Sequence, residues 1–113
     1  MKVSIFIPVK DNDGSCNKEL TQGKEWAMAE LYGGVTVTKG YGSWTHNGKL
    51  MKDKVKILTS YVEGGELQTR VHANMKVLAN GVLLSTDQLA VFYTIDNEGY
   101  TYKALTKTAE SDK

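Results

Sequence analysis

A twelve-residue stretch, Gly33–Trp44, constrains the fold of this chain more than any other part of the sequence. It contains four glycines and two aromatic residues. The first two glycines are suited to end a helix, because glycine adopts the left-handed conformation at no steric cost. Val35 and Val37 then alternate with threonines, which is the pattern of a strand with one aliphatic and one hydroxyl face. The stretch therefore predicts a helix that ends directly before a long strand.

This strand is predicted to form a long hairpin with the segment that follows it. His46, Asn47 and Gly48 form the predicted turn, and Asn-Gly is the strongest short hairpin signal because both residues tolerate a positive φ. The third strand is expected at about Leu50–Val62, where apolar residues alternate with lysines and serine.

The remaining elements follow from hydrophobic periodicity and turn signals. We expect a first strand at Lys2–Val9, a first helix at about 22–31 capped by Thr21, a second helix at 66–80 ended by Gly81, a connection at 82–86, and two further strands at Gln88–Ile95 and Tyr100–Leu105. Buried positions on the helices are expected to be Leu20, Trp26, Ala27 and Leu31 on the first and Leu67, Val71, Met75 and Leu78 on the second.

This order predicts an α+β fold of the ferredoxin-like kind, βαββαβ, with an extra C-terminal strand. Right-handed crossovers place both helices on one face of a single antiparallel sheet. The other face carries aliphatic and aromatic residues, so we expect a homo-oligomer that covers it. One domain is predicted over residues 1–105, followed by a polar, disordered tail at 106–113.

Composition excludes several classes of protein. The formal net charge is +1, so no global field attracts a long nucleic acid or a membrane, and any anion binding must be local. Cys16 is the only cysteine, which excludes an intrachain disulfide and favours a reducing compartment. The apolar run near the N-terminus is too short for a signal peptide or a membrane span, and we therefore expect a cytoplasmic protein of a bacterium or an infected host.

The segment Tyr32–Trp44 matches the pattern (F/Y)GG-x-T-V-x-x-G-x-G-x-W. With the first strand, the Asp-rich loop, the helix that carries Trp26 and the hairpin turn, it resembles a group of small bacterial and phage proteins of unassigned function. That resemblance spans about Val3–Leu58 and implies no particular active site. In size and character the chain is also similar to small oligomeric phage proteins of anti-defence function, which sequester the nucleotide signals of bacterial immunity.

A ligand site is predicted beside this strand. Glycines in a strand mark a bulge or the close approach of a ligand or backbone, and aromatic rings stack on planar ligands. Arg70 is the only arginine and is suited to an anionic group, although a salt bridge with Glu63 or Glu66 explains it equally well. The predicted ligand-binding residues are Thr36, Thr38, Gly40, Tyr41, Gly42, Trp44, Thr45 and Arg70.

No catalytic residue, metal ligand or cofactor is predicted. Asp11, Asp13 and Gly14 resemble part of a calcium loop, but Val9 and Leu20 would occupy its first and last ligand positions. His46 and His72 have no partner spacing that builds a triad or a metal site, and both are expected at the surface. Asp87 and Asp96 flank the fourth strand and do not form a carboxylate pair by themselves.

Three functions remain open from the sequence. The first is an oligomeric protein that binds or sequesters a small anionic, nucleotide-like ligand at a subunit interface. The second is an inhibitor or accessory factor that binds a protein through the sheet edge at Tyr100–Leu105. The third is a small isomerase or lyase of the dimeric ferredoxin-like kind, in which His72 or Asp87 takes part.

Overall fold

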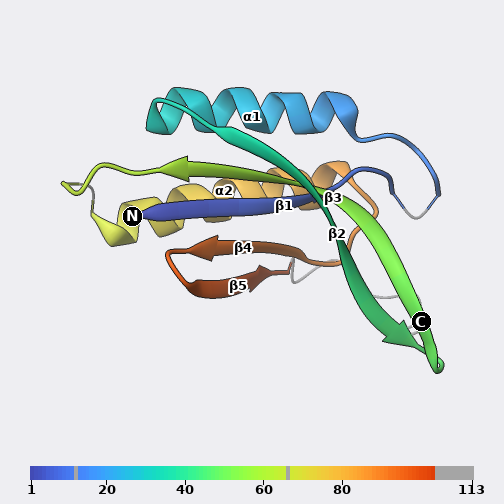
Figure 1. Cartoon of the computed structure of the whole chain (residues 1–113). Helices are drawn as coiled ribbons and strands as arrows, with labels where there is room; N and C mark the ends of the chain where they lie inside the picture. The colour runs from blue at the N-terminus through green and yellow to red at the C-terminus, as the bar shows by residue number, and fades with distance from the viewer. Residues whose placement is uncertain (12, 66, 104–113) are drawn as a thin grey trace.

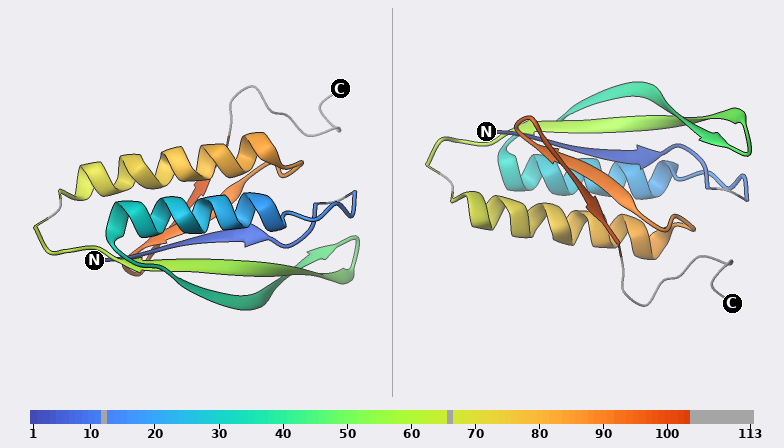
Figure 2. Two further views of the ribbon diagram at one scale, coloured as in Figure 1. Left: turned by 90° about the horizontal axis from the view of Figure 1, so that it is seen from above. Right: turned by 90° about the horizontal axis from the view of Figure 1, so that it is seen from below.

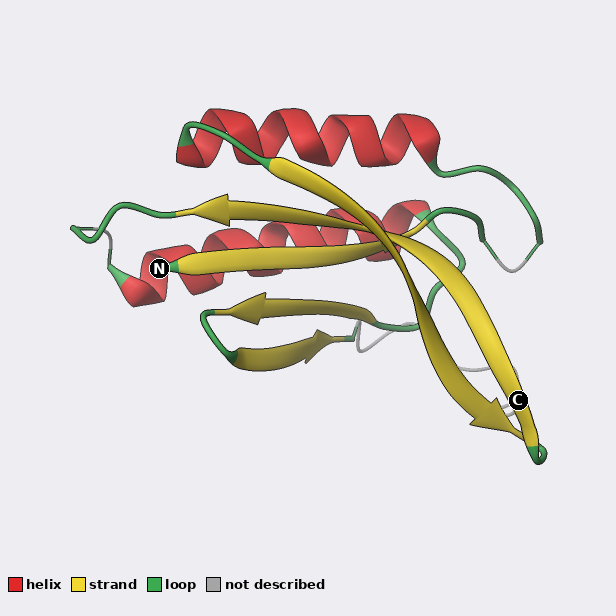
Figure 3. Cartoon of the chain, in the orientation of Figure 1, coloured by secondary structure: helices red, strands yellow, loops and turns green. Residues whose placement is uncertain are grey.

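The computed structural model describes residues 1–11, 13–65 and 67–103. Its elements are β1 (Lys2–Pro8), α1 (Lys18–Tyr32), β2 (Thr36–His46), β3 (Lys49–Tyr61), α2 (Gln68–Ser85), β4 (Val91–Ile95) and β5 (Glu98–Tyr102). The strands form one antiparallel sheet in the order β2-β3-β1-β4-β5. Both helices pack on the same face of this sheet (Figures 1, 2 and 3). The predicted ferredoxin-like order with an added strand is confirmed.

The core lies between the sheet and the two helices. Val3, Ile5 and Ile7 of the central strand β1 are fully buried, as are Met28 of α1 and Met75 of α2. Burying an aliphatic side chain of this size contributes about 1.5–3 kcal/mol. We call the side of the sheet that these residues occupy the helix face and the other side the open face.

The first helix begins one turn earlier than predicted. Thr21 is not its cap but lies inside it, and its hydroxyl donates to the carbonyl oxygen of Asn17 at 2.8 Å. The side-chain amide of Asn17 donates to the Pro8 carbonyl and to the Asp11 carboxylate at 3.1 and 2.9 Å, which holds the start of α1 against the end of β1. The helix ends at Gly33, as predicted, with φ of 84°.

The prediction that Trp26 belongs to the core is wrong. Its side chain is 72% exposed, and Leu31 is also exposed, whereas Thr21 and Met28 are the buried residues of α1. Residues two apart on a helix point about 200° away from each other. Because Met28 faces the sheet, Trp26 is turned toward solvent.

The second helix is longer than predicted. Gly81 does not end it, and the helix continues to Ser85. Val82 and Leu83, predicted to belong to a connection, are fully buried. Burial of these two side chains stabilises another turn against the sheet and outweighs the low helix propensity of glycine. The described part of the chain contains no helix long and apolar enough to cross a membrane.

Three of the four residues predicted to form the buried stripe of α2 are confirmed. Val71, Met75 and Leu78 are buried, whereas Leu67 is 62% exposed at the residue before the helix.

The two C-terminal strands are shorter or shifted relative to the prediction. β4 starts at Val91 instead of Gln88, and β5 covers Glu98–Tyr102 instead of Tyr100–Leu105. β5 forms one edge of the sheet and β2 the other. The predicted domain boundary at residue 105 and the predicted tail at 106–113 lie outside the described residues.

The predicted hairpin turn is confirmed and leads into an unusual feature. Asn47 and Gly48 have φ values of 51° and 76°. β2 and β3 pair without interruption from Thr36–Thr59 to His46–Lys49, so neither Gly40 nor Gly42 forms a bulge. β1 pairs with β3 only as far as Pro8–Val55. Beyond that pair the hairpin extends past the rest of the sheet (Figure 1), and we call its segment of residues 41–54 the arm.

We expect Gly99→Ala to destabilise the fold. A Cβ atom at position 99 would lie 2.6 Å from Cζ of Phe92, whose ring covers this glycine on the open face. Displacing the ring costs about 1 kcal/mol or more. The matched control is Gly42→Ala, also in a strand but with nothing within 4 Å of the added atom. Urea unfolding should show a loss of stability for the first variant only, and equal stabilities would contradict the packing described.

Candidate functional site at the root of the arm

The alternation of β2 divides the predicted site residues between the two faces of the sheet. A Cβ atom on Gly40 would point to the Val55 and Ile57 side chains, so Gly40 shares their face. Ile57 lies opposite Phe6 of β1. The residues on either side of Phe6, Ile5 and Ile7, point into the core, so Phe6 points away from it. Gly40 therefore lies on the open face. Thr36, Thr38, Gly42 and Trp44 share this face, whereas Tyr41 and Thr45 lie on the helix face.

Arg70 lies apart from both groups. It belongs to α2, which packs against β1, β4 and β5, while β2 is the strand at the opposite edge of the sheet. The structure thus brings the β2 residues into two neighbouring groups and leaves Arg70 outside both.

The open face carries exposed apolar side chains on the arm and in the middle of the sheet. The rings of Phe6 and Phe92 lie with their centroids 5.3 Å apart. Trp44 and Met51 are cross-strand neighbours on the arm and are 45% and 40% exposed. This face has the character of a contact surface, because solvent-exposed patches of this kind mark interfaces or ligand sites.

The helix face of the β2–β3 hairpin, from the Lys39–Lys56 pair into the arm, is basic and carries one aromatic ring. Lys39 lies opposite Lys56, Tyr41 opposite Lys54, and Ser43 opposite Lys52. The Tyr41 side chain is 65% exposed, and the ammonium of Lys52 lies 5.2 Å from its ring centroid. Sequence alternation was enough to place these lysines on one face. They were not predicted as ligand-binding residues, because the small net charge of the whole chain does not reveal a local basic surface.

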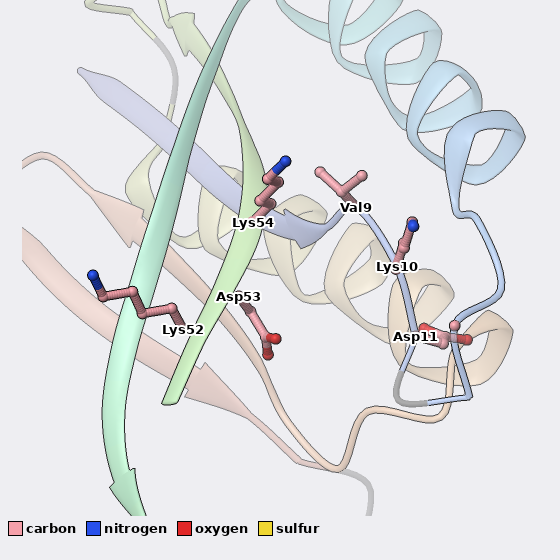
Figure 4. A pocket seen from close by; sticks show the side chains of 7 residues that line it. Val9, Lys10, Asp11, Lys52, Asp53 and Lys54 are labelled. Atoms are coloured by element: carbon pink, nitrogen blue, oxygen red, sulfur yellow. The ribbon is translucent and has the colours of Figure 1, made fainter. Parts of the chain in front are cut away.

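Two adjoining hollows lie where the arm leaves the sheet, and we call them together the root cleft. The first, of about 470 Å³, is lined by Val9, Lys10, Asp11, Gly14, Lys52, Asp53 and Lys54. The second, of about 480 Å³, is lined by Val9, Lys39, Gly40, Tyr41, Lys54, Val55 and Lys56. Val9 and Lys54 line both hollows. Figure 4 shows the first hollow between the segment after β1 and the edge of β3.

The loop after β1 holds its wall of the root cleft in place by its own hydrogen bonds. The amide of Asp11 donates to the Ser15 carbonyl, and that of Gly14, with φ of 87°, donates to the Asp11 carbonyl, both at 2.9 Å. Asp13 accepts hydrogen bonds from the hydroxyl and the amide of Ser15, and these bonds lower the pKa of its carboxyl group. These bonds fix Asp11 and residues 13–15 relative to one another.

One group of carboxylates has the spacing of a metal site. Oxygen atoms of Asp11, Asp13 and Asp87 lie within 4.8 Å of one another. However, Asp11 already accepts hydrogen bonds from the Asn17 amide and from the backbone amide of Asp87. The second of these bonds holds Asp11 beside Asp87, and three ligands fall short of the six to eight oxygens that calcium takes.

A second cluster of titratable side chains lies between α2 and the β4–β5 hairpin. The Nε2 atom of His72 lies 3.3 Å from the Tyr93 hydroxyl, and its ring meets that of Tyr100 edge-on at 4.7 Å. The Tyr93 and Tyr100 rings are stacked at 5.4 Å, and the Tyr100 hydroxyl donates to Glu98 at 2.7 Å. His72 is thus half-buried against tyrosines, a contact that needs the helix-to-sheet packing and was not predicted.

Comparisons with known proteins identify the fold. No protein-family model and no curated protein matches the chain. Two solved structures are similar to it. A phage SAM lyase in its apo state has a TM-score of 0.67 and 14% sequence identity, over 92% of this chain and 89% of that chain. A phage SAM lyase in complex with S-methyl-5′-thioadenosine has a TM-score of 0.66 and 14% identity, over 91% and 88%. At this identity the likeness shows a shared fold over nearly the whole chain.

The tyrosine cluster predicts a loss of stability at high pH. Burial raises the pKa of Tyr93, with a smaller contribution from Tyr102, and the hydrogen bond to Glu98 is the main cause that raises the pKa of Tyr100. Above the ordinary value of 10.0 the folded state keeps protons that the unfolded state has lost, so the free energy of unfolding falls as pH rises.

Urea unfolding between neutral pH and pH above 10 checks this. The double variant Tyr93→Phe, Tyr100→Phe should lose less stability over this range than the unchanged protein, and Tyr41→Phe, at an exposed ring, should not differ from it. An unaltered pH dependence in the double variant would show that other groups cause the effect.

Proposed function

We propose that this chain is a small enzyme of the lyase kind that binds a nucleoside derivative in the root cleft. The observation that carries the proposal is the meeting of an exposed aromatic ring with charged groups of both signs in one cleft. The shared fold supports it, since the similar protein is a SAM lyase and was solved with a nucleoside, S-methyl-5′-thioadenosine.

The second hollow suits the flat part of such a ligand. Tyr41 presents its ring there, and stacking of a base on an aromatic side chain contributes about 1–3 kcal/mol. Gly40 has no side chain, so a ligand can approach the strand backbone closely. Val9 and Val55 complete an apolar wall.

The first hollow suits a charged chain attached to the nucleoside. Lys10 and Lys54 offer ammonium groups to an anionic group of the ligand, and Asp11 and Asp53 offer carboxylates to a cationic one. S-adenosylmethionine is a nucleoside with a carboxylate, an ammonium and a sulfonium on one chain, so it presents charges of both signs.

A lyase step needs neither water nor an oxidant. When a carbon–sulfur bond of a sulfonium breaks, both bonding electrons stay on sulfur as a neutral thioether, and the carbon fragment balances by losing a proton to a base. Asp53, exposed on the wall of the first hollow, is the carboxylate that we assign to this role, because Asp11 already accepts two hydrogen bonds.

Binding without turnover is the second candidate function. One observation favours it: the root cleft is lined by no histidine, since His46 lies at the tip of the arm and His72 against the tyrosines of β4 and β5. A protein with this cleft and no competent base would hold a nucleotide-like signal and release it unchanged.

Native mass spectrometry with adenosine, S-methyl-5′-thioadenosine, S-adenosylmethionine and AMP tests the proposal. We expect a ligand adduct and, after incubation, a cleaved product from at least one compound. Tyr41→Ala should weaken binding about tenfold, since losing one stacked ring costs 1–3 kcal/mol. The control is Tyr61→Ala, at a tyrosine that is similarly exposed on the open face, 68% against 65% for Tyr41.

The outcomes separate the two candidate functions. A cleaved product that Asp53→Asn abolishes without loss of binding supports the lyase. An adduct without any product supports sequestration. If none of the compounds binds, or if Tyr41→Ala binds as well as the unchanged protein, the root cleft is not the ligand site.

The exposed arm also leads us to propose a homo-oligomer. A two-stranded ribbon alone is at best marginally stable in water, and the arm presents Trp44 and Met51 on the side that continues the apolar open face. A second copy of the chain covering this face would bury them and fix the arm beside the root cleft.

Light scattering after size-exclusion chromatography measures this state. We expect an oligomer that Trp44→Ser with Met51→Ser shifts toward monomer, because each loses about 1.5–3 kcal/mol of burial. Leu84→Ser is the control, since Leu84 is 72% exposed but lies on α2. A monomeric unchanged protein at micromolar concentration would contradict the proposed oligomer.

A further inference from the structure

The root cleft carries more positive than negative charge. Its lining includes five lysines, Lys10, Lys39, Lys52, Lys54 and Lys56, and two aspartates, Asp11 and Asp53, so three positive charges remain unmatched. The whole chain has a formal charge of only +1. The surplus is therefore a local property of this cleft.

The described part of the chain does not neutralise this surplus. None of the five ammonium groups has a carboxylate oxygen of a described residue within 4.0 Å. Lys39 and Lys56 lie directly opposite each other on paired strands, and like charges in this position destabilise a sheet. An anion between them would remove the repulsion and gain two charge-assisted contacts.

The lysines also surround the aromatic ring of the cleft. Lys52, Lys54 and Lys56 alternate along β3 on one face, with neighbours about 6.8 Å apart along the strand. Lys54 lies opposite Tyr41, and Lys52 lies over one side of its ring at 5.2 Å from the centroid. A ligand stacked on Tyr41 would therefore have ammonium groups on several sides.

We propose that the ligand of the root cleft is a nucleotide, with its base on Tyr41 and its phosphate among Lys39, Lys54 and Lys56. This inference rests on the proposed function for the location of the ligand only. It favours the second candidate function, binding without turnover, because a nucleotide has no sulfonium to cleave. A phosphate monoester carries a charge of about −1.5 to −2 at neutral pH, which offsets half or more of the surplus. A sulfonium nucleoside carries an additional positive charge, which the same lysines disfavour.

Exposed lysines have another use in sheets, which the test must separate from ligand binding. Lysines on edge strands prevent the pairing of one sheet with another, and β2 and the arm are such edges. That role requires charge only and gives no preference between a nucleoside and its phosphate.

Calorimetric titration of the unchanged protein with adenosine, AMP and S-adenosylmethionine tests the inference. We expect AMP to bind at least about tenfold more tightly than adenosine, because charge-assisted hydrogen bonds are the strong ones, and S-adenosylmethionine to bind more weakly than AMP. The preference for AMP should shrink as salt is raised, since ions screen exposed charges.

Two single variants locate the effect. Lys54→Ala and Lys56→Ala should each lower the affinity for AMP several-fold and leave that for adenosine nearly unchanged. Lys49→Ala is the matched control, because Lys49 is an exposed lysine of the same strand at the tip of the arm.

The possible failures are distinct. Equal affinities for adenosine and AMP, with both lowered by Tyr41→Ala, would overturn the nucleotide inference and leave the proposed site in place. If Tyr41→Ala changes neither affinity, both the site and the inference are wrong. An equal effect of Lys49→Ala on AMP binding would show general attraction by charge and would overturn the phosphate site.

Discussion

The end of β1 at Pro8 is the constraint on which the rest of the structure depends. β1 pairs with β3 as far as Pro8–Val55, and one further backbone hydrogen bond joins the Val9 amide to the Lys54 carbonyl at 3.0 Å. The chain then enters the loop that the Asn17 side chain ties to Pro8 and Asp11, while β2 and β3 continue together to their turn. The arm, its free edge and the root cleft beside the following loop all result from this difference in strand length.

Strand alternation then gives the arm two surfaces with different chemistry. Trp44 and Met51 extend the apolar open face, whereas Tyr41, Lys52 and Lys54 point to the other side. Because the two sets of side chains point in opposite directions, a second copy that covers Trp44 and Met51 would leave Tyr41 and Lys54 accessible to a ligand. Assembly can support the ligand site without covering it.

Local signals predicted the hairpin turn and the end of the first helix, but not the end of the second helix. The Asn47-Gly48 turn and the helix stop at Gly33 follow from backbone preferences of single residues, and both were correctly predicted. Gly81 has the same local preference but lies inside α2. Burial of Val82 and Leu83 stabilises the helix beyond it and outweighs that preference. Trp26 was misplaced for a related reason: the weakly amphipathic α1 does not show by sequence alone which side faces the sheet.

The sequence by itself determined the order of the elements, the hairpin and the alternation that separates Tyr41 from Gly40 and Gly42, because these depend on residues close together in the chain. Only the tertiary structure decided that Lys10 and Asp11 face β3 across the root cleft and that Arg70 lies on α2, which packs against β1, β4 and β5 and not against β2. The positions of these residues depend on where β1 ends and on how α2 packs. Both are set by contacts between segments far apart in sequence.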